Sequence, residues 1–222
     1  MKKQILLYLI TDRRAFLRSA EITHDDLPRL QLEAIAKAAQ AGCQLIQIRE
    51  KDMNAKALGA FTRAAVELAR PRGARVLVND RLDVAMSAGA DGVHLRASSI
   101  PAREVRAAAA QRGLKDFLIG VSTHSIAEAR LAEEGGADFI VCGPVYDTPS
   151  KREYGAPLGL DAFAEIRSAA QIPVLALGGI TLSNYREPLR RGAAGVAAIG
   201  LFTDLDNIEQ NIRSILNATY TV

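Results

Sequence analysis

Anion-binding side chains are concentrated in the stretch "GPVYDTPSKREYGAPLGL", residues 143–160. Thr148, Ser150 and Lys151 lie close together there, and hydroxyl and ammonium groups commonly bind anions. A compact domain rarely keeps a connection this long unless it serves as a lid or a binding loop. The stretch therefore predicts an anion-binding lid that carries these three side chains.

Other polar side chains follow short apolar runs, at points where the strands of a sheet would end. They are Gln47, Arg49, Lys51, Asn79, Asp80, His94, Arg96, Ser122 and His124. Because Arg49, Lys51 and Lys151 are cations on different loops of one predicted face, they predict a second anion site. Asn79 and Ser122 would supply hydrogen bonds to the same anion.

Glycines end the last two predicted strands. Gly178 and Gly179 follow one of them, and Gly200 follows Ile199 at the end of the other. Because glycine has no side chain, it lets backbone N–H groups approach a phosphate, and a short helix after Gly200 would aim its positive end at that phosphate. The alternative is that these glycines only turn the chain.

Asp80 and two histidines each have two interpretations. Asp80 beside cations suits a Mg²⁺ ion shared with a polyphosphate, or a salt bridge to Arg49 or Arg81. His94 ends an apolar run, so a structural histidine with satisfied hydrogen bonds is its default interpretation. His124 precedes a predicted helix, where it would be an acid/base group or would simply mark the turn.

Short apolar runs alternate with longer segments of helical spacing along the whole chain. The runs are Ile5–Ile10, Leu45–Ile48, Val76–Val78, Gly92–Leu95, Phe117–Val121, Phe139–Val141, Val174–Leu177 and Gly195–Ile199. Strands that alternate with helices predict right-handed βαβ units and a parallel sheet. Such units in 222 residues predict an α/β fold, a (β/α)₈ TIM barrel whose functional residues lie after the strands. We expect residues 1–222 to form one such domain; a flavodoxin-like sheet, which needs fewer strands, is the second choice.

The predicted helices have recognisable boundaries. Helical spacing covers Leu30–Ala41, Ala55–Arg70, Val105–Arg112 and Ala127–Glu134. Ser125 and Glu128 have the spacing of a capping box, which predicts that a helix starts after His124. Ser99 followed by Pro101 predicts another start, with the serine as cap and the proline in the first turn.

The composition is that of an ordinary globular protein with a full core, 49% apolar and 24% charged. The net charge is +3 and the basic residues are spread along the chain, so we expect no nucleic-acid and no membrane partner. Cys43 and Cys142 lie in apolar runs and are expected to be small buried hydrophobes. The first apolar run is too short to span a membrane, and we expect a cytoplasmic protein. The oligomeric state is left open, a homo-oligomer included.

A series of motifs occurs in order along the chain. They are "YLITD", "QIREKD", "NDRLDVAMSAGADGVHL", "IGVSTHSIAEA", "GADFIVCGPVYDTPSK", "PLGL", "PVLALGGIT" and "GAAGVAAIGLF". From about Leu7 to Phe202 the chain resembles thiamine phosphate synthase and its relatives, the TenI-type thiazole tautomerases. The resemblance implies a (β/α)₈ barrel that joins hydroxymethylpyrimidine diphosphate to thiazole phosphate. The thiazole nitrogen attacks the pyrimidine methylene carbon, and pyrophosphate leaves.

The resemblance also implies roles for individual residues. Pyrophosphate is held by Mg²⁺, with Asp80 as a metal ligand, and at positions that match Arg49, Lys51, Lys151, Asn79 and Ser122. The pyrimidine is held near the positions of Gln47 and His94. The thiazole phosphate lies at positions that match Thr148, Ser150, Gly178, Gly179, Ile199 and Gly200. Lys151 is expected to stabilise the charge that grows on pyrophosphate, rather than to transfer a proton.

The stretch "HLRASS" departs from the family pattern. Synthases usually follow this histidine with Gly-Gln-x-Asp, in which the aspartate is the second magnesium ligand; here Arg96 and Ser99 take the glycine and aspartate positions. We hypothesise that Arg96 replaces part of the missing metal charge and that Asp147 supplies a carboxylate from the lid. Alternatively, Arg96 is a solvated charge and Ser99 only a helix cap.

Three functions remain open at this point. Thiamine phosphate synthase is the first choice. A TenI-type thiazole tautomerase is the second; it would need no metal and would use His124 as its acid/base group. The third is a catalytically silent barrel that binds a thiamine precursor or product, and the intact set of Arg49, Lys51 and Lys151 argues against it.

Overall fold

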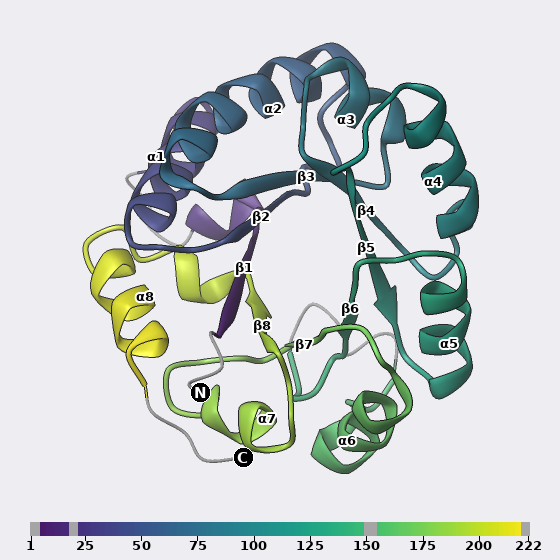
Figure 1. Cartoon of the computed structure of the whole chain (residues 1–222). Coiled ribbons are helices and arrows are strands. Elements are labelled where there is room, and N and C mark those ends of the chain that lie inside the picture. Colours follow the sequence, from purple (N-terminus) through teal and green to yellow (C-terminus); the bar gives the residue numbers. More distant parts are fainter. Residues whose placement is uncertain (1–4, 18–21, 149–154, 219–222) are drawn as a thin grey trace.

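Parallel strands close into a barrel in chain order from β1 to β8 (Figure 1). They are β1 (Leu6–Ile10), β2 (Leu45–Ile48), β3 (Arg75–Asn79), β4 (Gly92–Leu95), β5 (Leu118–Thr123), β6 (Phe139–Cys142), β7 (Val174–Leu177) and β8 (Gly195–Ala198). The computed structural model describes residues 5–17, 22–148 and 155–218. The predicted TIM barrel is confirmed, and the flavodoxin-like alternative is wrong because β1 pairs with β8 and closes the sheet. That residues 1–222 form a single domain stays a prediction.

Helices form a ring around the outside of the barrel (Figure 1). They are α1 (Leu27–Gln40), α2 (Ala55–Ala69), α3 (Leu82–Ser87), α4 (Ala102–Gln111), α5 (Ile126–Glu134), α6 (Gly159–Ala169), α7 (Arg186–Arg190) and α8 (Ile208–Leu216), with short 3₁₀ turns η1 (Arg13–Phe16), η2 (Arg70–Arg72) and η4 (Gly200–Phe202). The predicted helical segments correspond to α1, α2, α4 and α5. The helix α1 starts before the predicted Leu30 because Pro28 is accommodated in its first turn, where no N–H is needed.

Side chains along each strand alternate between the barrel interior and the helix ring. An apolar cluster fills the interior, and its buried members are Tyr8, Ile10, Leu45, Leu77, Phe139, Val141, Leu175 and Ala197. The same alternation places polar residues inward near the carboxyl ends of four strands. These residues are Gln47, Asn79, His94 and Ser122. The two-residue period of the strands therefore brings predicted site residues from distant parts of the chain to one end of the barrel.

One of the two predicted helix caps is confirmed and the other is wrong. The Ser125 side chain accepts a hydrogen bond from the Glu128 N–H and caps α5. In contrast, α4 has Pro101 at its N-cap and no side-chain cap. Ser99 does not cap α4 because its hydroxyl bonds to Asp80 and to the Arg96 N–H instead.

In the described part of the chain, no helix is long and apolar enough to cross a membrane. Cys43 and Cys142 are buried free thiols, as expected. Burial raises the pKa of each thiol to about 12, so neither is a reactive thiolate near neutral pH.

Candidate active site

Four polar side chains from different strands form one hydrogen-bonded chain inside the barrel. Gln47 Nε2 donates to the Tyr8 hydroxyl over 3.1 Å, and that hydroxyl lies 3.3 Å from His94 Nδ1. On the other side of the ring, His94 Nε2 is 2.9 Å from Ser122 Oγ. This interior chain joins β1, β2, β4 and β5, and it brings together three of the predicted site residues.

The hydrogen bonds of the interior chain favour one tautomer of His94. The Tyr8 hydroxyl accepts from Gln47, which leaves its single proton available for His94 Nδ1. A neutral imidazole that accepts at Nδ1 carries its proton on Nε2, and in this arrangement His94 donates to Ser122 Oγ. The hydroxyl proton of Ser122 is then directed to a group outside the interior chain.

His94 is held in its neutral form. Its residue is only 2% exposed, and burial, assisted by the positive charge of Arg49, lowers the pKa of the imidazole to about 3. The default interpretation of a buried histidine with satisfied hydrogen bonds is confirmed. The positive charge of Arg49 thus belongs to the electrostatic surroundings of this imidazole.

Because Gly120 has no side chain, the imidazole of His94 can occupy the space beside it. A Cβ at this position would lie 2.7 Å from His94 Nδ1 and 2.5 Å from Phe139 Cζ. The rings of Tyr8 and Phe139 pack edge to face beside it, with centroids 5.5 Å apart. The aromatic packing inside the barrel therefore depends on the absence of a side chain at residue 120.

Asp80 follows β3 and is bonded on both carboxylate oxygens. Arg96 Nη2 donates to Oδ2, and the Ser99 hydroxyl donates to Oδ1. The backbone N–H of Asp80 donates to the His94 carbonyl over 2.8 Å. Within the described ranges, Asp80 is the one residue other than glycine with positive φ, 61°. The carboxylate thus lies at the edge of the barrel mouth, joined to the loop after β4.

Two sequence-based alternatives for this region are wrong. Among the described residues Asp80 pairs with Arg96, not with Arg49 or Arg81. Arg81 instead binds Asp83 over 2.7 Å, because Asp83 is only two residues away in the first turn of α3. Arg96 is therefore not simply a solvated charge.

Arg49 and Lys51 lie on the loop after β2, and acidic residues anchor this loop. Glu50 accepts a hydrogen bond from Arg13 Nη1 over 2.8 Å, and Asp52 binds the same nitrogen over 2.8 Å. The Glu50 side chain is only 2% exposed, and its burial raises the pKa of the carboxyl. These contacts fix the loop of Arg49 against η1, which follows β1.

The long loop after β6 is described at both ends. The Leu158 N–H donates to the Pro144 carbonyl over 2.8 Å, so the two ends of the loop lie together. Thr148 belongs to the described part and is partly buried. Ser150 and Lys151 lie outside the described residues, so their predicted roles stay predictions.

The glycine pair after β7 packs closely against this loop. Gly178 has φ 96° and Gly179 has φ 65°, values that other residues rarely adopt. A Cβ on Gly178 would lie 2.4 Å from Pro144 Cβ, and one on Gly179 would lie 2.7 Å from Tyr146 Cβ. Turning the chain is thus one reason for both glycines, and their contact with a phosphate stays a prediction.

The expected short helix after β8 is present as η4. It begins at Gly200, directly after Ile199. A Cβ on Gly200 would meet no atom within 4 Å, so the space above this backbone is open. The arrangement is compatible with the predicted approach of a phosphate to the backbone.

His124 lies apart from the interior chain. Its side chain is 53% exposed, and Nδ1 is 3.2 Å from Glu128 Oε2 on α5. Its backbone N–H donates to the same oxygen over 2.6 Å. In the described contacts, His124 belongs to the start of α5 rather than to the barrel interior.

Tyr8 is the main site residue that the sequence analysis missed. It lies in an apolar run that predicts a strand, but a buried tyrosine hydroxyl also needs a hydrogen-bond partner. The two-residue alternation from Leu6 already places Tyr8 inward, where polar residues of neighbouring strands could reach it. The inward position of Tyr8 and the need of its hydroxyl for a partner together predict a hydrogen bond inside the barrel.

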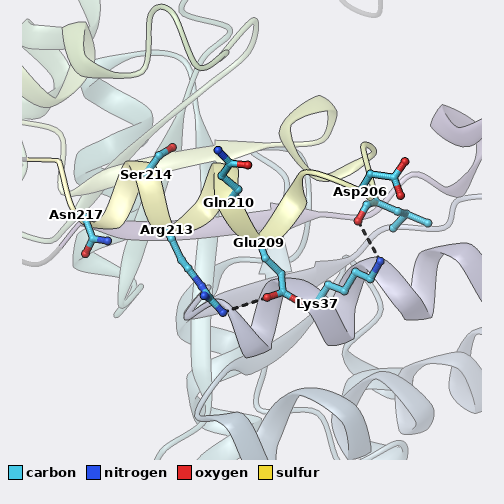
Figure 2. Close-up of a pocket in the computed structure, with 8 residues that line it drawn as sticks. Lys37, Asp206, Glu209, Gln210, Arg213, Ser214 and Asn217 are labelled. Atoms are coloured by element: carbon cyan, nitrogen blue, oxygen red, sulfur yellow. Dashed lines mark hydrogen bonds and ion pairs between the residues drawn. The ribbon is translucent and has the colours of Figure 1, made fainter.

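A separate groove of about 540 Å³ lies among α1, α8 and the segment before α8 (Figure 2). It is lined by Lys37, Leu205, Asp206, Glu209, Gln210, Arg213, Ser214 and Asn217. Lys37 Nζ donates to the Leu205 carbonyl over 3.0 Å, and Arg213 binds Glu209 over 3.1 Å. Since no predicted site residue lines this groove, we place the chemistry at the barrel mouth.

The fold and the mouth together are typical of (β/α)₈ barrels that act on small phosphorylated molecules: a buried neutral hydrogen-bonding chain lies beneath loops that carry arginine and lysine. Residues 7–202 match the thiamine monophosphate synthase family. The chain belongs to this family.

Individual relatives match over nearly their whole length. A relative from Geobacter sulfurreducens is 42% identical over 215 residues, which cover 97% of this chain and 94% of its own. The thiamine-phosphate synthase of Methanoculleus marisnigri is 39% identical over 209 residues, which cover 94% of this chain and 92% of its own. A solved structure, thiamine phosphate pyrophosphorylase from Pyrococcus furiosus, is 30% identical with a TM-score of 0.78 and covers 96% of this chain and 94% of its own.

Proposed function

We propose that this protein is a thiamine phosphate synthase, which couples hydroxymethylpyrimidine diphosphate to thiazole phosphate and releases pyrophosphate. Family membership over residues 7–202 supports this function. The observation that carries it is the interior chain of Gln47, His94 and Ser122 next to the charge of Arg49. The uncharged hydrogen-bonding groups of the interior chain suit a neutral pyrimidine ring. The cations on the loops at the barrel mouth suit the diphosphate that this ring carries.

The proposed reaction needs charge stabilisation and no proton transfer. The bond between the pyrimidine methylene carbon and the diphosphate oxygen breaks, and its electron pair leaves with pyrophosphate. The lone pair of the thiazole nitrogen forms the new C–N bond, so the product is a thiazolium and no proton is gained or lost. Arg49, Lys51 and Lys151 would stabilise the charge that develops on the leaving oxygens.

The protonation state of His94 is compatible with this reaction, which needs no proton transfer. With a pKa of about 3, His94 neither donates a proton nor acts as a strong base near neutral pH. As a neutral partner it can orient the Ser122 hydroxyl. A tautomerase must move a proton on the thiazole, and the histidine predicted for that step, His124, lies outside the interior chain beside Glu128.

Asp80 is the predicted Mg²⁺ ligand, and its surroundings do not fit that ion. Mg²⁺ requires a near-octahedral set of oxygen ligands, whereas both oxygens of Asp80 are bonded to Arg96 and Ser99. In the described ranges, no three His, Cys, Asp or Glu side chains lie together as a metal site. The Mg²⁺ requirement is thus an expectation from the family resemblance alone, and the steps above need only the protein's own residues.

The decisive experiment is thiamine phosphate formation by the purified protein from both phosphorylated precursors, with Mg²⁺ and with EDTA. Product in either condition supports the synthase. If no product forms and the thiazole phosphate is isomerised instead, the tautomerase is correct and His124→Ala should abolish its activity. Binding of precursors without any turnover would indicate the silent barrel. A cytoplasmic location and a homo-oligomeric state also stay predictions.

A further inference from the structure

We propose that Arg96 takes the place of a divalent cation in this site, so that the protein binds a diphosphate group through Arg96 without a metal ion. This inference rests on the proposed function, because it concerns the diphosphate half of the same site. It assigns a substrate-binding role to Arg96, for which the sequence allowed either a replacement of the metal charge or a solvated charge.

The first support is the position of the Arg96 guanidinium. It is bonded to Asp80 Oδ2, on the carboxylate that would otherwise be available to a cation at the barrel mouth. The other oxygen, Oδ1, accepts a hydrogen bond from Ser99. A dication on Oδ2 would have to displace Arg96, because two cations in contact with one oxygen repel each other strongly; a dication on Oδ1 would have to displace the hydroxyl proton of Ser99 from that oxygen.

The second support is that the backbone and the side chain of Arg96 are both fixed. The Arg96 N–H donates to Ser99 Oγ over 2.9 Å, and the Ser99 N–H donates to the Arg96 carbonyl over 3.0 Å. Ser99 therefore connects the Arg96 backbone to the carboxylate that the Arg96 side chain binds. Asp80 is itself fixed by its N–H bond to the carbonyl of His94. The guanidinium is thus held at the Asp80 carboxylate.

The third support is the balance of charge. A magnesium ion held by two carboxylates is formally neutral, and so is one carboxylate paired with one guanidinium. An uncharged serine at position 99 together with an arginine at position 96 therefore keeps the local net charge of a two-carboxylate metal site. Either change alone would shift that charge by one unit.

The fourth support is the exposure of Arg96. Its side chain is 58% exposed, compared with 25% for Asp80. A guanidinium has five N–H donors in a planar fork, and the bond to Asp80 uses Nη2. The exposed part of the fork can donate to two oxygens of a diphosphate, a geometry that arginine provides and lysine does not.

The test is the binding of inorganic pyrophosphate to the full-length protein, measured by isothermal titration calorimetry in EDTA and again with Mg²⁺. We expect binding in EDTA, and we expect Arg96→Ala to weaken it on the order of 10- to 100-fold, the effect of losing a hydrogen bond from a charged group. Arg96→Lys should recover only part of the loss because it keeps the charge and lacks the fork. Arg81→Ala is the matched control: it removes an equal charge from the neighbouring loop, where Arg81 binds Asp83, and should change the affinity far less.

A gain-of-function variant tests the same idea from the other side. The double variant Arg96→Gly, Ser99→Asp removes the guanidinium and adds a second carboxylate beside Asp80. We expect it to bind Mn²⁺, detected by electron paramagnetic resonance, and to require a metal ion for pyrophosphate binding. The unaltered protein should bind Mn²⁺ at this site much more weakly.

Two results would overturn the proposal: pyrophosphate binding by the unaltered protein that disappears in EDTA, or Arg96→Ala binding that matches that of Arg81→Ala. These readouts are independent of turnover. A protein that binds pyrophosphate without metal and forms no thiamine phosphate would contradict the proposed function alone. A protein that forms thiamine phosphate and binds pyrophosphate only with Mg²⁺ would contradict this inference alone.

Discussion

The polar groups in the centre of the barrel differ in burial and in charge from those on its rim, the loops around the barrel mouth. In the centre, Tyr8 and His94 are almost fully buried, uncharged and bonded to each other. On the rim, Asp80 and Arg96 are partly exposed and bonded as an ion pair. Burial keeps the groups in the centre uncharged, whereas access to solvent allows the groups on the rim to carry charge.

This difference follows from the cost of desolvating a charge. A buried ionised group is strongly disfavoured, so burial holds His94 neutral and leaves it as a positioning group. A polyanion, in contrast, needs cationic partners, which are stable only where water or an opposite charge is close. The buried centre of the barrel is therefore suited to a neutral ring, and the exposed rim is suited to phosphate.

The largest expected effect comes from removing the positive charge of Arg49, which is proposed to bind the diphosphate and also lowers the pKa of His94. Arg49→Ala should lower kcat/KM for thiamine phosphate formation on the order of 10²- to 10³-fold, because it removes a preorganised charge from the leaving group. It should also raise the pKa of His94, since the charge of Arg49 lowers it. The pKa should still stay below its ordinary value because burial is the main cause. Steady-state kinetics and an NMR titration of the imidazole measure both effects.

Arg49→Lys is the control for that experiment. It keeps the positive charge, so the pKa of His94 should stay close to that of the unaltered protein. If Arg49→Ala leaves this pKa unchanged, the rim and the centre are not electrostatically coupled.

The pH dependence of stability tests whether the centre is truly neutral. The pKa of His94 is about 3 in the folded protein and near 6.5 when the side chain is exposed. Between these values the unfolded state binds the additional proton, so this residue makes stability fall as the pH drops from 6.5 toward 3. The slope is at most about 1.4 kcal/mol per pH unit.

His94→Gln should remove this slope. Urea unfolding of both proteins at several pH values in that range gives the comparison, and the carboxylates common to both cancel in the difference. The same pH dependence in both proteins would contradict a buried neutral imidazole. Above pH 6.5, this residue should contribute no pH dependence to the difference.

Crowding the centre should cost stability without changing any charge. Gly120→Ala places a Cβ 2.7 Å from His94 Nδ1, and overpacking of this kind costs roughly 1–3 kcal/mol. Gly59→Ala is the matched control, because a Cβ there would lie 3.6 Å from its nearest neighbour in the middle of α2. That change should stabilise the protein by about 0.5–1 kcal/mol. Denaturant midpoints of the two variants should move in opposite directions, and equal shifts would contradict the proposed packing.

The smallest expected effect is the loss of one hydroxyl from the interior chain. Tyr8→Phe keeps the ring packed on Phe139 but removes the group between Gln47 and His94. The loss of stability should be roughly 1–2 kcal/mol, since polar partners remain buried. Chemical denaturation measures the loss, and ¹⁵N shifts of the imidazole report whether Nδ1 has lost its donor. An unchanged Nδ1 shift would show that Tyr8 does not bind the ring.

The sequence was sufficient to predict the barrel because short apolar runs that alternate with segments of helical spacing form a local pattern that repeats along the chain. Gln47, His94 and Ser122 could be placed at strand ends for the same reason. The partner of Asp80 could not be predicted, because it depends on two loops that meet only once the sheet has closed. Ser99 was assigned to the wrong role since a serine before a proline satisfies the rules for a helix cap equally well. The lid residues Ser150 and Lys151 remain predictions from sequence alone.

The interior chain has a polarity that one distant atom determines. Because Gln47 presents Nε2 to Tyr8, the favoured arrangement has each group donating a hydrogen bond to the next, and Ser122 keeps a free donor at the far end. In Gln47→Glu, a carboxyl oxygen that accepts from the Tyr8 hydroxyl would reverse every hydrogen bond along the chain. Ser122 would then offer a lone pair instead of a proton. The group that Ser122 offers at the barrel mouth would thus depend on the side chain of Gln47, at the other end of the interior chain.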